Sequence, residues 1–201
     1  MRFNVAELTQ AAVASTGHGP CTSITKLAEG GSSKVFLITM EDGFEVIAKV
    51  PTPIAGPRHY LTASEVATMD FLRSEVGLPI PRVYGWNSSA AVEENPVGAE
   101  YVIMEKVQGV ELSRCWRGLT KKERLAVIRQ ICEYENKLFT TPFEQIGGLY
   151  YPSSLSPEER GCTIKDSRWC FGPSPSSTFW HGERQQLQLD RGPCTTLLCC
   201  H

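Results

Sequence analysis

The sequence of 201 residues lacks the features that mark several large classes of protein. No apolar run approaches the roughly 18 residues of a membrane span. The N-terminal stretch MRFNVAELTQAAVASTG has no charged region followed by an apolar core, which a secretory signal would have. The 20 lysines and arginines of the whole sequence are scattered, so no nucleic-acid surface is indicated. We therefore expect no membrane span and no nucleic-acid partner, and the N-terminus favours the cytoplasm.

Cysteine is also sparse, and eight in 201 residues is far below the density of a disulfide-stabilised secreted domain. A reducing compartment is therefore indicated. The C-terminal cysteines and His201 have no CxxC spacing, so we expect no metal site there. What is present is an ordinary globular composition, 41% hydrophobic and 21% charged with a formal net charge of −2, in a chain long enough for one sizeable domain.

Helices and strands are predicted from capping residues and from periodicity. The predicted helices are 5 to 16 after Asn4, 63 to 76 with Thr62 and Glu65 as a capping box, and 120 to 139 with Thr120 and Glu123 as a second capping box. The predicted strands are 21 to 28, 34 to 40, 44 to 50, 82 to 86 and 99 to 106, with short candidates at 148 to 151 and 162 to 171. Residues 107 to 119 are expected to be a connector.

A glycine-rich loop, EGGSSK, lies between the first two predicted strands. Gly30 and Gly31 would let the backbone approach a ligand closely, and their amides could point at anionic oxygens. The loop is not a full GxGxxG motif, so in isolation a plain Gly-Gly hairpin turn is the favoured interpretation.

Lys49 lies in a predicted strand whose other residues are largely apolar. Side chains alternate along a strand, so Lys49 shares one face with Ile47, while Val46 and Val50 share the other. A lysine in such a strand costs desolvation unless an anion holds its charge. It indicates either a charge partner or a lysine at the sheet edge with its stem lying on apolar surface.

Glu65 is the candidate partner of Lys49. On the predicted helix it is in line with Met69 and Leu72, on the stripe that should face the sheet. The alternative is that Glu65 only completes the capping box with Thr62, and the two roles are compatible. A strand lysine followed by a helix glutamate is the order of a pair that grips nucleotide phosphates.

The stretch YVIMEKVQG at residues 101 to 109 is typical of a strand that leads into a hinge. Backbone groups from Glu105 to Val107 would bond the edge of an adenine, and Met104 would lie at the back of the pocket with Ile47. The alternative is an ordinary buried strand.

Four motifs occur in order: KLAEGGSSKVFLITMEDGFEVIAKVPTP, TASEVATMDFLR, PIPRVYGW and NPVGAEYVIMEKVQGVEL. Together they resemble the fungal branch of the aminoglycoside phosphotransferase and choline kinase-like family, close to its altered inheritance of mitochondria group, from Phe3 to about Cys194. The resemblance implies an α+β, protein-kinase-like fold, with an antiparallel sheet and one packed helix in the N-terminal lobe. It also implies ATP with magnesium, phosphoryl transfer to a small-molecule hydroxyl, and mitochondria as the alternative compartment.

By matching position, the resemblance implies a role for each residue of the opening motif. Lys49 would hold the α and β phosphates and Glu65 would orient Lys49. The loop residues Gly30, Gly31, Ser32 and Ser33 would cover the phosphates.

The same resemblance calls for a catalytic loop similar to HGDxxxxN, whose Asp accepts the hydroxyl proton and whose Asn binds metal. The last asparagine of this sequence is Asn136, and the near match HGERQQLQL has Glu183 and Gln188 at the two positions. Glu183 is the one catalytic candidate, yet its segment resembles a stretch upstream of that loop. We therefore expect a partial ATP site that binds weakly, truncated before the catalytic loop and without turnover.

The expected domains are a kinase-like N-terminal lobe at 1 to 106, a hinge and first C-lobe helix at 107 to 141, and a family insertion with a divergent tail at 142 to 201. A rival hypothesis is a non-enzymatic, pseudokinase-like module that binds a protein partner through the apolar stripe of the helix at 120 to 139, namely Val127, Ile131, Tyr134 and Leu138. A third is a gene-model fragment.

Overall fold

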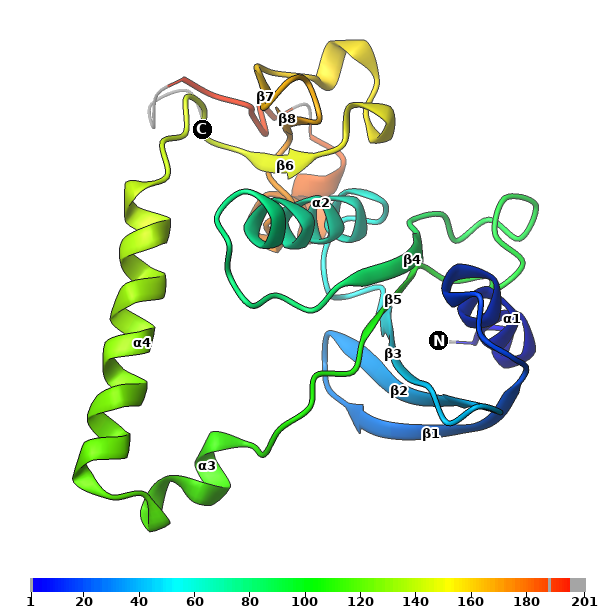
Figure 1. The fold of residues 1–201 in the computed structure, drawn as a ribbon. Coiled ribbons are helices and arrows are strands. Elements are labelled where there is room, and N and C mark those ends of the chain that lie inside the picture. Colours follow the sequence, from blue (N-terminus) through cyan, green and yellow to red (C-terminus); the bar gives the residue numbers. More distant parts are fainter. Residues whose placement is uncertain (1, 188, 196–201) are drawn as a thin grey trace.

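The computed structural model describes residues 2–187 and 189–195. Four layers follow one another: helix α1, a five-stranded sheet, helix α2 and a three-stranded sheet, with helix α4 standing apart from them (Figure 1). This mixture of antiparallel sheet and helices confirms the predicted α+β fold class.

The five-stranded sheet has the strand order β1-β2-β3-β5-β4, and every neighbouring pair is antiparallel. Its strands are β1 (Cys21–Glu29), β2 (Ser33–Met40), β3 (Glu45–Pro51), β4 (Val83–Asn87) and β5 (Tyr101–Glu105). All five predicted strands are confirmed to within two residues at each end.

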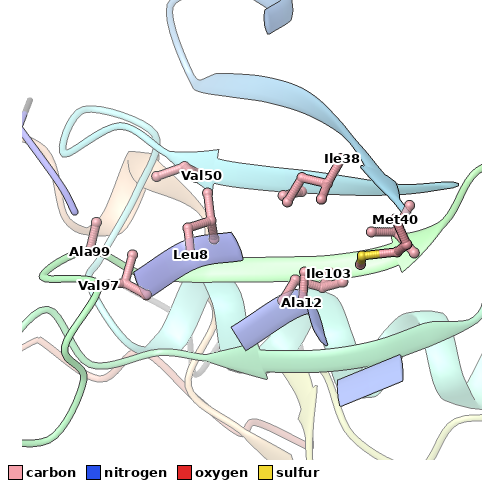
Figure 2. Close-up of a cluster of buried hydrophobic side chains, with 10 residues drawn as sticks. Leu8, Ala12, Ile38, Met40, Val50, Val97, Ala99 and Ile103 are labelled. Carbon is pink, nitrogen blue, oxygen red and sulfur yellow. The ribbon is translucent and has the colours of Figure 1, made fainter. Parts of the chain in front are cut away.

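Helix α1 (Val5–Thr16) forms as predicted. The Asn4 side chain accepts hydrogen bonds from two backbone N–H groups of the first turn. Gly17 follows the helix at φ 74°, a left-handed conformation that glycine adopts without strain. Leu8 and Ala12 are fully buried against the sheet, where they pack with residues of β2, β3, β5 and the loop before β5 (Figure 2).

Helix α2 (Tyr60–Ser74) begins three residues earlier than predicted, and the capping box of Thr62 and Glu65 is wrong. The N-cap is His59, at φ 68° and without a side-chain cap. Thr62 instead donates its hydroxyl to Glu100 Oε2 (2.5 Å), and Glu100 Oε1 accepts the His59 N–H (3.0 Å). The buried carboxylate of Glu100, which directly precedes β5, therefore replaces the local cap.

The stretch expected to be a connector contains helix α3 (Leu112–Cys115) and the 3₁₀ turn η1 (Trp116–Gly118), so that expectation is wrong in part. Helix α4 (Lys121–Thr140) follows, with the capping box of Thr120 and Glu123 as predicted. None of its residues is buried. Within the described residues, no helix is both long and apolar enough to cross a membrane.

The second sheet has three strands in the order β6-β8-β7: β6 (Gly148–Tyr150), β7 (Thr163–Ile164) and β8 (Trp169–Gly172). The short strands predicted near 148 to 151 and 162 to 171 are present, and the second region is divided into β7 and β8 because residues 165–167 have φ between 48° and 66° and turn the chain back. Short 3₁₀ turns connect the rest: η2 (Pro152–Ser154), η3 (Pro157–Glu159), η4 (Ser177–Phe179) and η5 (Gly182–Gln185).

A candidate nucleotide site

An ion pair joins β3 to α2. Lys49 Nζ lies 2.5 Å from Glu65 Oε1, and the two side chains are 29% and 25% exposed. β3 lies between β2 and β5, so Lys49 is not at the sheet edge and that alternative is excluded. Because α2 begins at Tyr60, Glu65 is too far into the helix to complete a cap and is free to serve Lys49.

The alternation of β3 fixes the direction of Lys49. Val46, Ala48 and Val50 are fully buried on the face that packs against α1. Lys49 and Ile47 therefore point to the opposite face, where they are half-buried. The predicted division of the strand into two faces is confirmed.

The glycine-rich loop connects β1 to β2 beside the end of β3. Gly30 N–H donates to Ser33 O (3.0 Å), and Thr52 donates its N–H to Ser32 O (3.0 Å) and its hydroxyl to Gly31 O (2.7 Å). Ser33 pairs with Pro51 and Val35 with Lys49, so the loop begins about two residues, or roughly 7 Å, beyond Lys49 along the strands.

The fold itself does not require glycine at Gly30 or Gly31. Neither residue has a φ in the left-handed region, and a Cβ at either would meet nothing within 4 Å. The space above both backbones is open, which is the room that a ligand would need. The two interpretations of the loop, a plain hairpin turn and a loop that covers phosphates, therefore differ only in whether a ligand occupies this space.

Charge near the loop is positive. Glu29, the last residue of β1, is 2.7 Å from Lys26 Nζ and 3.0 Å from Lys34 Nζ. Hydrogen bonds from these lysines lower the pKa of Glu29 from 4.5 to about 2. One carboxylate thus serves two lysines, which leaves a net positive charge next to the loop.

An apolar surface continues from Lys49 along the same face of the sheet. Across the ladders, Val35 opposes Lys49, Leu37 opposes Ile47, and Ile47 opposes Met104. All four apolar side chains are half-buried. The sequence prediction named Ile47 and Met104 but missed Val35 and Leu37, although the alternation in KVFLITM and the pairing of β2 with β3 would have found them.

The hinge after β5 offers fewer backbone groups than expected. Glu105 N–H donates to Arg82 O (2.8 Å), and Glu105 Oε2 accepts the Arg82 N–H (3.0 Å). The Glu105 amide is therefore not available to a ligand. Val107 is 62% exposed, and within the described residues its N–H and C=O have no hydrogen-bond partner.

Residues 23–160 match the model of a family described as the phosphotransferase enzyme family. The chain belongs to this family. Among its relatives, a subtelomeric hrmA-associated cluster protein of Aspergillus fumigatus is 49% identical over 174 residues, which cover 87% of this chain and 33% of the relative. Altered inheritance of mitochondria protein 9, mitochondrial, of Lachancea thermotolerans is 30% identical over 188 residues, which cover 85% of this chain and 30% of the relative.

This phosphotransferase-family chain spans about a third of the length of the curated relatives it matches. A solved aminoglycoside 2′-phosphotransferase IIIa mutant in complex with GDP aligns with a TM-score of 0.51 at 18% identity, covering 69% of this chain and 42% of that one. At this identity the likeness shows the fold, and the fold is protein-kinase-like, as predicted.

The structure describes only part of the near match HGERQQLQL. Glu183 lies on η5 and is exposed, and Gln188 lies outside the described residues. Cys194 is buried and bonded through its backbone to Ile146, whereas Cys199, Cys200 and His201 lie outside the described residues. Where the structure describes the chain, no three His, Cys, Asp or Glu residues gather as metal ligands would.

Proposed function

We propose that this phosphotransferase-family chain uses residues 23–107 to bind ATP, the phosphoryl donor of the family. The observation that carries the proposal is the Lys49–Glu65 ion pair on the inner face of the sheet. A half-buried lysine held by a carboxylate can grip phosphate oxygens while its charge stays compensated before the ligand arrives.

The other parts of the site would each bind one part of the nucleotide. The backbone from Gly30 to Ser33 would cover the phosphates in the open space above the two glycines. The apolar side chains of Val35, Ile47 and Met104 would pack on the base. Val107, rather than Glu105, would supply the N–H and C=O that bond its edge.

The described residues bring together no group of three or more metal-ligating side chains, so they offer no candidate site for a magnesium ion held by protein alone. An ion that arrives with ATP would keep phosphate oxygens and water as ligands, as Mg²⁺ often does. We therefore derive no step through magnesium. We also propose no phosphoryl transfer by these residues alone, since the sequence has no asparagine beyond Asn136 and Glu183 is exposed on a surface turn.

The proposed division of labour follows the chain. Residues 1–106 bind the nucleotide, residues 107–141 form the hinge and a long helix, and the chain from residue 142 on is an insertion. β6 and β8 pack on α2, so the proposed insertion contacts the nucleotide-binding part directly.

The test is the Lys49→Ala variant with ATP and adenosine as ligands in isothermal titration. The unchanged protein should bind ATP weakly, with a Kd on the order of 0.1 to 1 mM, or about 4 to 5.5 kcal/mol. Lys49→Ala should weaken ATP binding by about tenfold, the effect of one lost charged contact, and leave adenosine nearly unchanged.

Lys106→Ala is the matched control. Lys106 Nζ lies 2.5 Å from Glu45 Oε2, and the two side chains are 31% and 30% exposed, so this pair equals the Lys49 pair in length and burial. Glu45 is four residues, or roughly 13 Å, along β3 from Lys49, away from the glycine loop. Lys106→Ala should not change the affinity for ATP relative to the affinity for adenosine. Equal losses of both ligands in Lys49→Ala, or no binding at millimolar ATP, would overturn the proposal.

A second candidate function is suggested by α4. Five large apolar residues of this helix are more than 40% exposed, and at about 100° per residue they fall within one arc of roughly 140°. They are Leu125, Ile128, Ile131, Leu138 and Phe139. The predicted stripe is rotated, since Val127 and Tyr134 are half-buried.

We propose that this face binds an apolar surface of a protein partner. In a purified sample that partner would be a second copy of the chain. The double variant Ile128→Glu and Ile131→Glu should abolish self-association in light scattering and reduce binding of a hydrophobic dye. A monomeric parent protein that binds no dye would argue against this candidate.

A further inference from the structure

Helix α2 makes contacts on two opposite faces, one toward each sheet. At about 100° per residue, Ala63, Ala67, Asp70 and Phe71 lie roughly 140° to 240° around the helix from Glu65. Glu65 reaches Lys49 of the five-stranded sheet. The opposite face meets the three-stranded sheet, so α2 lies between the two sheets (Figure 1).

Polar contacts tie the opposite face of α2 to the chain from β6 to β8. Arg168 Nη2 lies 3.0 Å and 2.8 Å from the two carboxylate oxygens of Asp70, and the Tyr151 hydroxyl donates to Asp70 Oδ2 (2.8 Å). At the start of the helix the Tyr60 hydroxyl donates to Glu159, and His59 Nε2 donates to Ser154 O (2.6 Å).

Apolar contacts reinforce these ties along the same face. Ala67 and Phe71 are buried with Leu149, Trp169 and Phe171. One turn earlier, Ala63 is buried with Tyr150, Leu155 and Cys170.

The ion pair of Lys49 does not hold α2 in this orientation by itself. A pair that is about a quarter exposed contributes little compared with two buried apolar clusters. The start of the helix is also held from the side of the five-stranded sheet, since Glu100 accepts the Thr62 hydroxyl and the His59 N–H, but the two apolar clusters bury more of the helix. The rotation of α2, and with it the direction of Glu65, is therefore set mainly from the side of the three-stranded sheet.

We propose that residues 148–172 are a brace that fixes α2, and that Asp70 is a positioning residue that acts through Glu65 on Lys49. This inference rests on the proposed nucleotide site for its functional meaning. The geometric part stands separately, because it concerns only the Lys49–Glu65 contact and the packing of α2.

The test measures that contact directly, without nucleotide. A carbodiimide converts a lysine–carboxylate ion pair into an amide, and the cross-linked peptides are quantified by mass spectrometry. Lys49–Glu65 and Lys106–Glu45 should both cross-link, since each pair is 2.5 Å apart with similar exposure. Asp70→Asn should lower the yield of the first relative to the second by about twofold or more, as loss of one ion pair shifts a two-state population.

Glu75→Gln, at the C-cap of the same helix, is the matched control. Glu75 Oε2 lies 3.7 Å from Lys165, whose side chain is 61% exposed, so this contact between α2 and the β7–β8 turn is long and open to water. The cross-link ratio should not change. The Lys106–Glu45 cross-link reports in every variant that the five-stranded sheet is folded.

The same variants then separate the two proposals. An unchanged cross-link ratio in Asp70→Asn and in Phe171→Ala, which opens the apolar cluster on the same face of α2, overturns the brace, whatever the protein does with nucleotide. A reduced ratio with a matching loss of ATP affinity, and no loss for adenosine, supports both. A reduced ratio in a protein that binds ATP and adenosine alike supports the brace and overturns the nucleotide site.

Discussion

At the scale of single residues, two lysine–glutamate pairs on β3 look alike and have different surroundings. Lys49–Glu65 and Lys106–Glu45 have the same N–O distance and similar exposure. Both the glutamate and the lysine of β3 share a face with Ile47, but only Lys49 lies beside the glycine-rich loop and opposite Val35. The geometry of an ion pair therefore does not identify a site, and its neighbours do.

Tyr60 yields a pH-dependent prediction at the same scale. Burial, and then the hydrogen bond to Glu159, raise the pKa of Tyr60 from 10.0 to about 12. The folded state thus favours the neutral phenol, so its contribution is complete below pH 10 and is lost as the pH rises toward 12. Tyr60→Phe should cost about 1 kcal/mol at pH 8, after allowance for solvent screening, and almost nothing at pH 11. Denaturant unfolding of both proteins at the two pH values measures the gap, and a constant gap would contradict the assignment.

At the scale of elements, local signals predicted those helix starts whose capping side chains bond only within the first turn. Asn4 caps α1 and Thr120 caps α4 as the sequence indicates. The same type of signal at Thr62 and Glu65 was misleading, since their side chains bond Glu100 and Lys49, which are 38 and 16 residues away. A capping pattern describes a helix start only where tertiary partners do not compete for it.

The candidate site was predictable to a similar extent. Alternation along β3 and the stripe on α2 placed Lys49 and Glu65 correctly, because both depend on local periodicity. The occupied amide of Glu105 was not predictable, because it depends on how Arg82 and β4 align with β5. Strand register follows from the whole sheet rather than from one segment.

At the scale of the whole molecule, α2 contacts both sheets, by an ion pair on one side and by buried apolar residues on the other. One of its faces serves the five-stranded sheet through Glu65, and the other is buried with the three-stranded sheet through Ala67 and Phe71. The two sheets are connected through this helix, whereas α4 buries no residue in either core. We therefore expect the sheets to unfold together and α4 to exchange its amide hydrogens separately.

Two core substitutions test this coupling, with a surface substitution as control. Leu8→Ala opens the core under α1, and Phe171→Ala opens the cluster on the other side of α2; the two residues are 0% and 3% exposed. Each should lower the free energy of unfolding by about 2 to 5 kcal/mol. Phe139→Ala on α4 also removes a phenylalanine side chain, but from a position that is 91% exposed. It should change the free energy of unfolding by less than about 0.5 kcal/mol. Because α2 contacts both sheets, Leu8→Ala and Phe171→Ala should each speed amide exchange in β3 and β8 alike. Faster exchange confined to the sheet that carries the substitution would show that the two sheets unfold independently.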